Sequence, residues 1–520
     1  MKDTRAALVL VAIFVAAVFV VDPRGDFPLD DDWGVGFTTF TLAGSGTIEF
    51  TPFASATAYL QFLWGAAWVA IFGPTFTVLR FATLALSLGS TLLLYSLLRY
   101  AGVRPPLALF GAASLLFNPL YFWASFTSMT HVPFVFMALV AATMFVRAWD
   151  REGIWLALAF IATVASFFTR QFAILNAIAP LTVALLARRW RLASVYAAAA
   201  GVFGLLVVGG VLVASQKELV LHRPSAAGLA QRAAHYLFFN WQHAALFFAP
   251  LLLLVLLSRP RVRTSPLFMA LAALIFGFAA WRMTVRVGMP IPYMNSGNVF
   301  TDFGLGPPTL RDVFTLRMRH PFALDWSIRL VLMFLSVVAS VLAVGITAAA
   351  VRRREPLLRY AAVFCACGTA IVAFMRIHFD RYSIDTLWPL VIVLVLLAAS
   401  QEWTFAARAV TGAIMIFTIV FSLSATSEYL DWNRARWSAY SWLRASGVTL
   451  EQMDGGYEIN SMLALRAGRK DLGKPGVGVV DDRFILTFNR DVPGYEPLRS
   501  FAYERWFGLG EGSVWVQRRR

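Results

Sequence analysis

Long apolar runs separated by short polar segments dominate the sequence. A helix needs about 20 apolar residues to cross a hydrocarbon core about 30 Å thick. The first run, Ala7–Val21, follows Lys2 and Arg5 and has no small-x-small cleavage site behind it, so we interpret it as a retained signal anchor. The pattern predicts thirteen crossings, at 7–21, 79–98, 107–122, 131–147, 154–168, 172–187, 192–214, 244–258, 266–281, 326–350, 358–375, 383–399 and 408–425.

Basic clusters between these runs predict the orientation, because cytoplasmic loops carry an excess of Lys and Arg. They place the N-terminus in the cytoplasm. The apolar segment 57–73 is short and contains Gln61, so we expect a helix at or dipping into the outer interface there, not a crossing. The clusters are Arg99/Arg104, Arg147/Arg151, Arg188/Arg189/Arg191, Arg259/Arg261/Arg263 and Arg352/Arg353/Arg354/Arg359.

This topology divides the chain into two parts. Residues 1–427 form an α-helical polytopic membrane domain with outer loops at 22–56, 215–243 and 282–325. Residues 428–520 change composition abruptly and predict a small extracytoplasmic α/β domain. Its predicted elements are a helix at Trp432–Gly447 and strands at Val477–Val480, Phe484–Phe488 and Val514–Val516.

Composition narrows the class of protein. Hydrophobic residues make up 59% of the 520 residues and charged ones 14%, against about 45–50% and about 25% in soluble domains. A soluble multidomain enzyme is therefore excluded. The net charge of +16 is explained by cytoplasmic loops, so no nucleic-acid partner is expected. Cys365 and Cys367 lie inside an apolar run, which excludes a disulfide framework or a zinc cluster.

The first outer loop holds the strongest candidate chemistry. Asp30, Asp31 and Asp32 stand beside Trp33, just after a crossing. Crowded carboxylates near low-dielectric material raise at least one pKa toward a value useful for a general base. The same oxygens, those of Asp30 and Asp31 above all, could hold a divalent cation, Mg or Mn. The alternative is a solvated acidic turn that caps a helix.

Other polar residues fall at the same predicted outer face. Arg170 and Gln171 lie between two crossings, and a guanidinium there suits a phosphate or a structural carboxylate partner. His131, Arg381 and Tyr382 are further candidates for substrate binding. The structural alternative for His131 is a hydrogen-bonded residue at a helix end, and for Arg381 and Tyr382 it is an anchor at the membrane interface. Glu49 precedes Pro52, which by itself indicates a helix start. A carboxylate cluster and arginines on one face favour a substrate held partly in lipid, with an anionic headgroup.

These motifs, in this order, resemble the polytopic lipid-linked-sugar glycosyltransferases of the GT-C superfamily. The resemblance is strongest to bacterial members of the family 39 and protein-mannosyltransferase-like group, with the lipid A aminoarabinose transferases more distant. It covers about residues 1–400 and, more loosely, the tail. Its carriers are Leu29-Asp30-Asp31-Asp32-Trp33, Arg80, Asn118-Pro119-Leu120-Tyr121, Ser128-Met129-Thr130-His131-Val132-Pro133, Thr169-Arg170-Gln171 and Arg381-Tyr382.

The resemblance implies an inverting transfer of a sugar from a polyprenyl-phosphate donor to an acceptor hydroxyl of a glycan, lipid or protein. An acidic residue within Asp30–Asp32 would be the base, and we favour Asp31 with Asp30 next. Glu49 would bind the headgroup and Arg170 would steady the departing phosphate. Relatives usually have Asp where this chain has His131, and a histidine cannot supply a carboxylate to a cation. The resemblance therefore leaves metal-assisted and metal-independent transfer both open, and His131 would instead donate to the phosphate or serve as an alternative base.

Two other classes of function stay open. A transporter or flippase of a lipid-linked saccharide should carry ionisable residues at mid-membrane and repeated halves. Here the acids cluster outside, and no repeat is visible in the sequence. An envelope scaffold acting through the tail would tolerate charge changes in the first outer loop. The sequence therefore favours an enzyme of the outer face of the cytoplasmic membrane.

Overall fold

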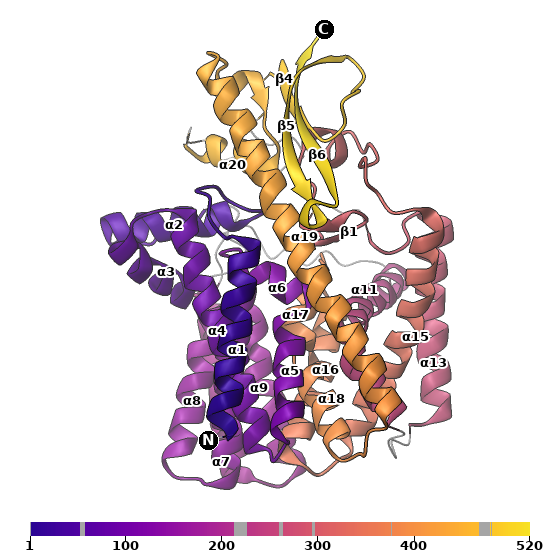
Figure 1. Cartoon of the computed structure of the whole chain (residues 1–520). Helices are drawn as coiled ribbons and strands as arrows, with labels where there is room; N and C mark the ends of the chain where they lie inside the picture. The colour runs from indigo at the N-terminus through magenta and orange to yellow at the C-terminus, as the bar shows by residue number, and fades with distance from the viewer. Residues whose placement is uncertain are drawn as a thin grey trace.

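The computed structural model describes residues 2–51, 58–212, 226–258, 264–293, 297–375, 377–466, 468, 479 and 481–520. A bundle of helices makes up most of the molecule, and a small sheet lies beyond one end of it (Figure 1). The N-terminus lies at the other end of the bundle (Figure 1). This arrangement separates a helical body from a small C-terminal α/β region.

Among the described residues, eight helices are long and apolar enough to cross a membrane, or up to ten if two bent pairs each form one span. The predicted class, a helical polytopic membrane protein with a small C-terminal α/β region, is confirmed; the count of thirteen crossings stays a prediction. The eight are α1 (Lys2–Val21), α4 (Phe76–Tyr100), α7 (His131–Asp150), α10 (Trp190–Val208), α13 (Pro266–Trp281) with the π-turn η2 (Arg282–Arg286), α15 (Trp326–Val351), α16 (Pro356–Ala373) and α19 (Phe405–Ala445).

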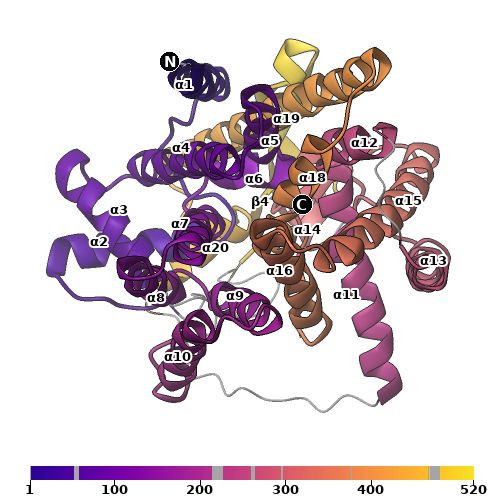
Figure 2. The ribbon, with the colours of Figure 1, turned by 90° about the horizontal axis from the view of Figure 1, so that it is seen from below.

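The eight helices differ in how far they are covered by the rest of the chain. Seen from below, α1, α10 and α13 lie at the rim of the bundle and α16 lies near its centre (Figure 2). Burial agrees, with 22%, 22% and 28% of the apolar window buried in the three rim helices and 56% in α16. The rim helices therefore present apolar side chains outward, as a protein surrounded by lipid requires.

Prolines break three of the apolar segments. α5 (Pro105–Leu116) meets α6 (Pro119–Ser125) at 67°, and α11 (Ala226–Phe247) meets α12 (Ala249–Leu257) at 77°. Pro119 cannot donate a backbone hydrogen bond, and the Asn118 side chain instead accepts one from Leu120 N at 3.1 Å. Pro389 similarly separates α17 (Tyr382–Leu387) from α18 (Leu390–Ala399). Such breaks need polar partners within the protein, and two of them border the candidate site.

Three shorter helices and one 3₁₀ turn complete the apolar body. They are α3 (Tyr59–Phe72), α8 (Ile154–Phe167), η1 (Gln171–Ile174) and α9 (Leu175–Leu186).

The first outer loop is more structured than predicted. The predicted interfacial segment 57–73 contains α3, but 22–56, predicted as a loop, contains a second helix, α2 (Asp32–Ser45). α2 includes Gly34 and Gly36, which weaken helix propensity. Tertiary packing overrides that propensity, because a Cβ at Gly36 would lie 2.5 Å from the Phe76 ring. Gly36 therefore lowers the helix propensity of α2 and also allows α4 to approach α2 closely. This is why the sequence pattern did not predict α2.

The segment 215–243, predicted as an outer loop, is corrected over its second half. α11 starts at Ala226 and carries polar residues that the hydropathy pattern excluded from a helix of the bundle. Their partners lie inside the protein: Gln242 Nε2 donates to Ser336 Oγ at 2.6 Å, and Tyr293 OH donates to Gln242 Oε1 at 2.8 Å. Residues 215–225 lie outside the described residues.

The third outer segment, 282–325, is irregular as predicted and lies against α19. It contains the hairpin β1 (Phe300–Thr301) and β2 (Gly304–Leu305) and the single turn α14 (Arg311–Phe314). Gly306 has a φ of +92°, and a Cβ there would lie 1.9 Å from the Tyr429 ring. Only glycine permits this approach.

The C-terminal region is a four-stranded sheet that packs on the end of α19. Strand order is β3-β4-β6-β5, with β3 and β4 parallel and the other pairs antiparallel. α19 runs unbroken across the predicted boundary at 427–428, and Glu428 pairs with Arg505 of β5 at 2.7 Å. The elements are the 3₁₀ turn η3 (Leu450–Gln452), β3 (Met453–Asp454), α20 (Tyr457–Arg466), β4 (Phe484–Thr487), β5 (Tyr495–Arg505), the turn η4 (Trp506–Gly508) and β6 (Gly510–Arg519).

The elements predicted for residues 428–520 agree with the structure in part. The predicted helix at Trp432–Gly447 is the end of α19, and the predicted strands Phe484–Phe488 and Val514–Val516 fall in β4 and β6. Apart from residue 479, the predicted strand Val477–Val480 lies outside the described residues. β5 was not predicted.

Candidate active site

Arg381, immediately before α17, joins the two predicted carboxylates of the first outer loop. Its Nη2 donates to Asp31 Oδ2 at 2.6 Å, and its Nη1 donates to Asp30 Oδ2 and to Gly297 O, the latter at 2.8 Å. Arg381 and Asp30 are buried, whereas 43% of the Asp31 side chain is exposed. Three residues that the sequence singled out separately therefore form one cluster, and Asp31 is its accessible carboxylate.

Asp30 is held from its side chain and its backbone. Its N–H donates to Glu458 Oε1 at 3.1 Å, and its φ of +51° lies in the left-handed region that Asp tolerates better than most residues. Burial raises the pKa of the Asp30 carboxyl, and Arg381 opposes that rise. For Arg381, burial lowers the pKa and the carboxylates of Asp30 and Asp31 raise it by more, so the guanidinium stays charged.

Asp32 faces the protein interior. Its Oδ1 accepts from Leu29 N at 2.6 Å and its Oδ2 from Ser128 N at 3.3 Å, so the carboxylate ties the first loop to the segment that precedes α7. Burial raises its pKa to about 7. Both oxygens accept from backbone N–H groups outside any helix, so Asp32 holds the backbone of the first outer loop. The capping alternative is not met, because the N-cap residue of α2 is Asp31 and its side chain makes no capping hydrogen bond.

A second cluster forms around Asp385 of α17. Asp385 Oδ1 lies 3.0 Å from His131 Nδ1 at the start of α7, and its Oδ2 lies 3.1 Å from Arg170 Nε. Arg170 also donates from Nη1 to Thr130 Oγ1. The contact with Asp385 is an ion pair, and the bond to Thr130 uses one of the five N–H donors of a guanidinium. The structure thus brings together His131 and Arg170, which the sequence placed on one face.

The two clusters are neighbours through α17. Arg381 and Asp385 are four residues apart, which is about one helical turn. Tyr382 follows Arg381, and its ring centroid lies 5.0 Å from Arg170 Cζ and 6.1 Å from the His131 ring. Tyr382 therefore packs against the Arg170 cluster and directly follows Arg381, the arginine of the acidic loop cluster.

Two further predicted site residues contact other parts of the chain. Glu49 is exposed, and its backbone oxygen accepts from Thr38 Oγ1 at 2.7 Å. Gln171 Nε2 donates to Leu212 O, beyond the end of α10, at 3.3 Å. Residues 52–57, which follow Glu49 closely, lie outside the described residues. The headgroup role of Glu49 stays a prediction.

Arg80 of α4, one of the residues that carry the resemblance, braces the first loop. Its guanidinium donates to the carbonyl oxygens of Pro23 at 3.0 Å and Gly25 at 2.7 Å, and also to that of Phe27. A buried guanidinium needs such acceptors. Arg80 therefore fixes the backbone that leads to Asp30.

The C-terminal region contributes residues that the sequence analysis missed. Tyr457 OH donates to Asp31 Oδ1 at 2.8 Å, and Glu458 pairs with Arg436 of α19 at 2.6 Å. Asp385 was also missed, although its spacing from Arg381 on a helix is a signal that could have found it. Tyr457 and Glu458 carry no local signal, because their contacts join residues more than 400 positions apart.

The carboxylates considered for Mg or Mn from the sequence contact a guanidinium in this structure. Arg381 binds an oxygen of both Asp30 and Asp31, and the divalent cation stays a prediction. Among the described residues, no group of three His, Cys, Asp or Glu side chains is arranged to hold a metal ion. The chemistry proposed below uses no metal.

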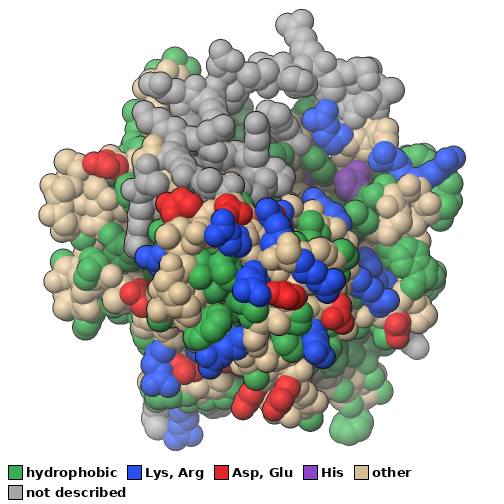
Figure 3. Space-filling view, turned by 90° about the horizontal axis from the view of Figure 1, so that it is seen from above, with side chains coloured by type: hydrophobic (Ala, Val, Ile, Leu, Met, Phe, Trp, Pro, Cys, Tyr) green, Lys and Arg blue, Asp and Glu red, His purple; other side chains and the backbone are tan. Residues whose placement is uncertain are grey.

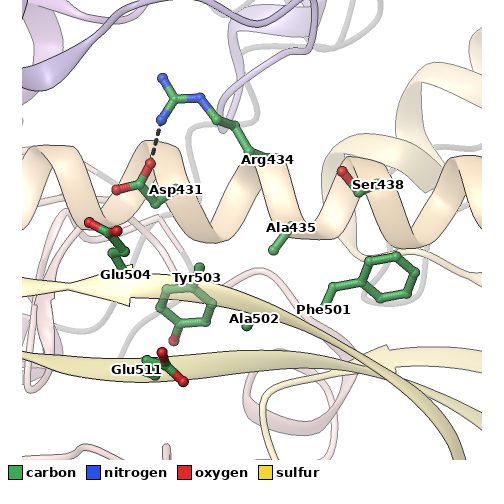
Figure 4. A pocket seen from close by; sticks show the side chains of 9 residues that line it. All are labelled: Asp431, Arg434, Ala435, Ser438, Phe501, Ala502, Tyr503, Glu504 and Glu511. Atoms are coloured by element: carbon green, nitrogen blue, oxygen red, sulfur yellow. Dashed lines mark hydrogen bonds and ion pairs between the residues drawn. The ribbon is translucent and has the colours of Figure 1, made fainter. Parts of the chain in front are cut away.

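A separate cleft of about 460 Å³ lies between α19 and the strands β5 and β6 (Figure 4). Asp431 and Arg434 of α19 form an ion pair at 2.5 Å along one wall, and Tyr503 and Glu511 come from the strands (Figure 4). It contains none of the predicted site residues. Charged side chains of both signs also gather on the face seen from above (Figure 3), so charge alone does not mark a site there.

No protein-family model matches this chain, and no curated protein sequence does. It is similar to two crystal structures of ArnT from Cupriavidus metallidurans, one bound to undecaprenyl phosphate and one in the apo state. The first is 13% identical with a TM-score of 0.37, over 98% of this chain and 97% of ArnT. The second is 14% identical with a TM-score of 0.37, over 98% of each.

The buried bridge between Arg381 and Asp30 predicts a strong thermodynamic coupling. Arg381→Gln should lower the melting temperature in detergent markedly, because breaking a buried pair costs about 3–5 kcal/mol. Adding Asp30→Asn should restore part of that loss, since no uncompensated charge then stays buried. The exposed pair Arg518–Glu496, 53% and 40% exposed, is the matched control and should show about 0–1 kcal/mol of coupling. Simple additivity at both pairs would contradict a structural bridge at Arg381.

Proposed function

We propose that the protein is a membrane glycosyltransferase. It moves a sugar from a polyprenyl-phosphate donor to an acceptor hydroxyl at the outer face of the cytoplasmic membrane, with inversion at the anomeric carbon. One observation carries the proposal. A half-exposed carboxylate, Asp31, is hydrogen-bonded on both oxygens, and the arginine cluster around Arg170 lies about one turn of α17 away.

Asp31 is the general base. Arg381 and Tyr457 each take one lone pair, one on each carboxylate oxygen, and a carboxylate has about four acceptor positions. Asp31 can therefore still accept the proton of an acceptor hydroxyl. As that O–H bond breaks, the acceptor oxygen bonds to the anomeric carbon, and the bond from this carbon to the phosphate oxygen breaks with both electrons going to the phosphate.

Arg170 stabilises the departing polyprenyl phosphate. Arginine binds phosphate with a planar set of N–H donors, and its value is greatest where charge develops in the transition state. Asp385 holds Arg170 and His131 together, so it orients the donors that meet the phosphate. Sugar and acceptor identity follow from neither cluster, and the acceptor class stays a glycan, lipid or protein.

Asp31→Asn tests the base assignment. The variant should insert and fold normally, while kcat falls about 10²- to 10⁴-fold, the usual contribution of a positioned base. The measurement is mass spectrometry of polyprenyl phosphate released by purified protein from candidate polyprenyl-phosphate sugars. Asp325→Asn is the control, because Asp325 is an outer carboxylate with 81% of its side chain exposed and should be silent. Normal product from Asp31→Asn would exclude Asp31 as the base.

Arg170→Ala tests the phosphate assignment. Donor Kd should rise about 10- to 100-fold, as expected for the loss of hydrogen bonds to a charged group. Arg170→Lys keeps the charge and loses the planar guanidinium, so its donor Kd should lie between those of Arg170→Ala and the wild type. Donor titration and turnover measure both effects. An unchanged donor Kd and turnover in Arg170→Ala would leave Arg170 as a structural partner of Asp385 only.

A further inference from the structure

The start of α20 is fixed rigidly against the third outer segment. Tyr457 N donates to Thr309 O at 3.1 Å. Gly456, with a φ of +89°, brings its backbone so close that a Cβ would lie 2.7 Å from the same oxygen. Asp454 Oδ1 accepts from Gly456 N at 3.0 Å and from Asn460 Nδ2 at 2.7 Å. The first turn of α20 therefore has one well-determined position.

Glu458 ties this turn to α19 and to the first outer loop. Its Oε2 lies 2.6 Å from Arg436 Nη1 and accepts from Thr309 Oγ1 at 2.7 Å, while its Oε1 accepts from Asp30 N. Glu458 and Arg436 are fully buried. Removing either partner would leave a buried charge unpaired, so α20 and the backbone at Asp30 are held in register with each other.

Tyr457 uses this position to reach Asp31. Its OH donates to Asp31 Oδ1 at 2.8 Å, and its ring packs edge-on against Trp33 at 6.4 Å between centroids. Burial, followed by the charge of Asp31, raises the pKa of Tyr457 well above its ordinary value. The phenol is therefore protonated and a hydrogen-bond donor at physiological pH.

From this geometry we infer that Tyr457 is a positioning residue for the base, so that the C-terminal region completes the active site. The inference rests on the proposed function. Arg381 holds one oxygen of Asp31 and Tyr457 holds the other. A carboxylate held at one oxygen only can turn about its terminal torsion, which is broad for Asp. With both oxygens held, the free lone pairs have one direction, toward the acceptor hydroxyl.

The test is Tyr457→Phe, which keeps the ring against Trp33 and removes only the hydroxyl. We expect kcat to fall about 10- to 100-fold, the value of one hydrogen bond to a charged group, with donor KM unchanged within about twofold. Tyr495→Phe is the matched control. Tyr495 is in the same region, and its OH donates to Asp482 Oδ2 at 2.9 Å, so this variant loses an equivalent bond elsewhere and should keep full kcat.

Three further outcomes decide the inference. Adding Tyr457→Phe to Asp31→Asn should cost nothing more, because a positioning residue acts only through its partner. Full kcat in Tyr457→Phe beside an inactive Asp31→Asn would overturn the inference and leave the proposed function intact. A fall in kcat matched by a fall in melting temperature that Tyr495→Phe reproduces would also overturn it, since the effect would then be general destabilisation. Turnover by Asp31→Asn would instead overturn the proposed function.

Discussion

The candidate site depends on the ionic bridge from Arg381 to Asp30 and Asp31. This bridge joins the first outer loop to a helix about 350 residues later in the chain. Buried charges are stable only when paired, so Asp30 and Arg381, which are both buried, require each other. The bridge also leaves Asp31 partly exposed while Asp30 is enclosed. Adjacent carboxylates are thereby given different environments, which is how one of them can be reserved for chemistry.

The broken helices explain why the polar residues can gather where they do. Backbone freed by a break in an apolar helix needs partners that lipid cannot supply. Pro119 and Pro389 stand at two such breaks. The break at Pro119 precedes the turn that carries Ser128 and His131, and α17, which carries Arg381 and Asp385, ends just before Pro389. The candidate site is therefore built from the segments that the hydrophobic pattern interrupts.

The sequence predicted the helical membrane body, and it named most residues of the two candidate clusters, because both leave local signals. Apolar runs identify helices, and charges at their outer ends identify the face on which Asp31, Arg170 and Arg381 meet. α2 and the first half of α11 were missed because tertiary contacts outweigh weak helix propensity and polar composition there. Asp385 could have been predicted from its spacing from Arg381. Tyr457 could not have been predicted, because its role depends on a contact between the two ends of the chain.

Following both halves of one donor decides whether the proposed enzyme breaks the bond between the sugar and the lipid phosphate. Purified protein in proteoliposomes would receive polyprenyl-phosphate hexoses and pentoses labelled on the sugar, with envelope extract as the source of acceptor. We predict one molecule of free polyprenyl phosphate for each labelled sugar transferred. Labelled lipid that crosses the bilayer intact, without release of polyprenyl phosphate, would contradict it and identify a transporter.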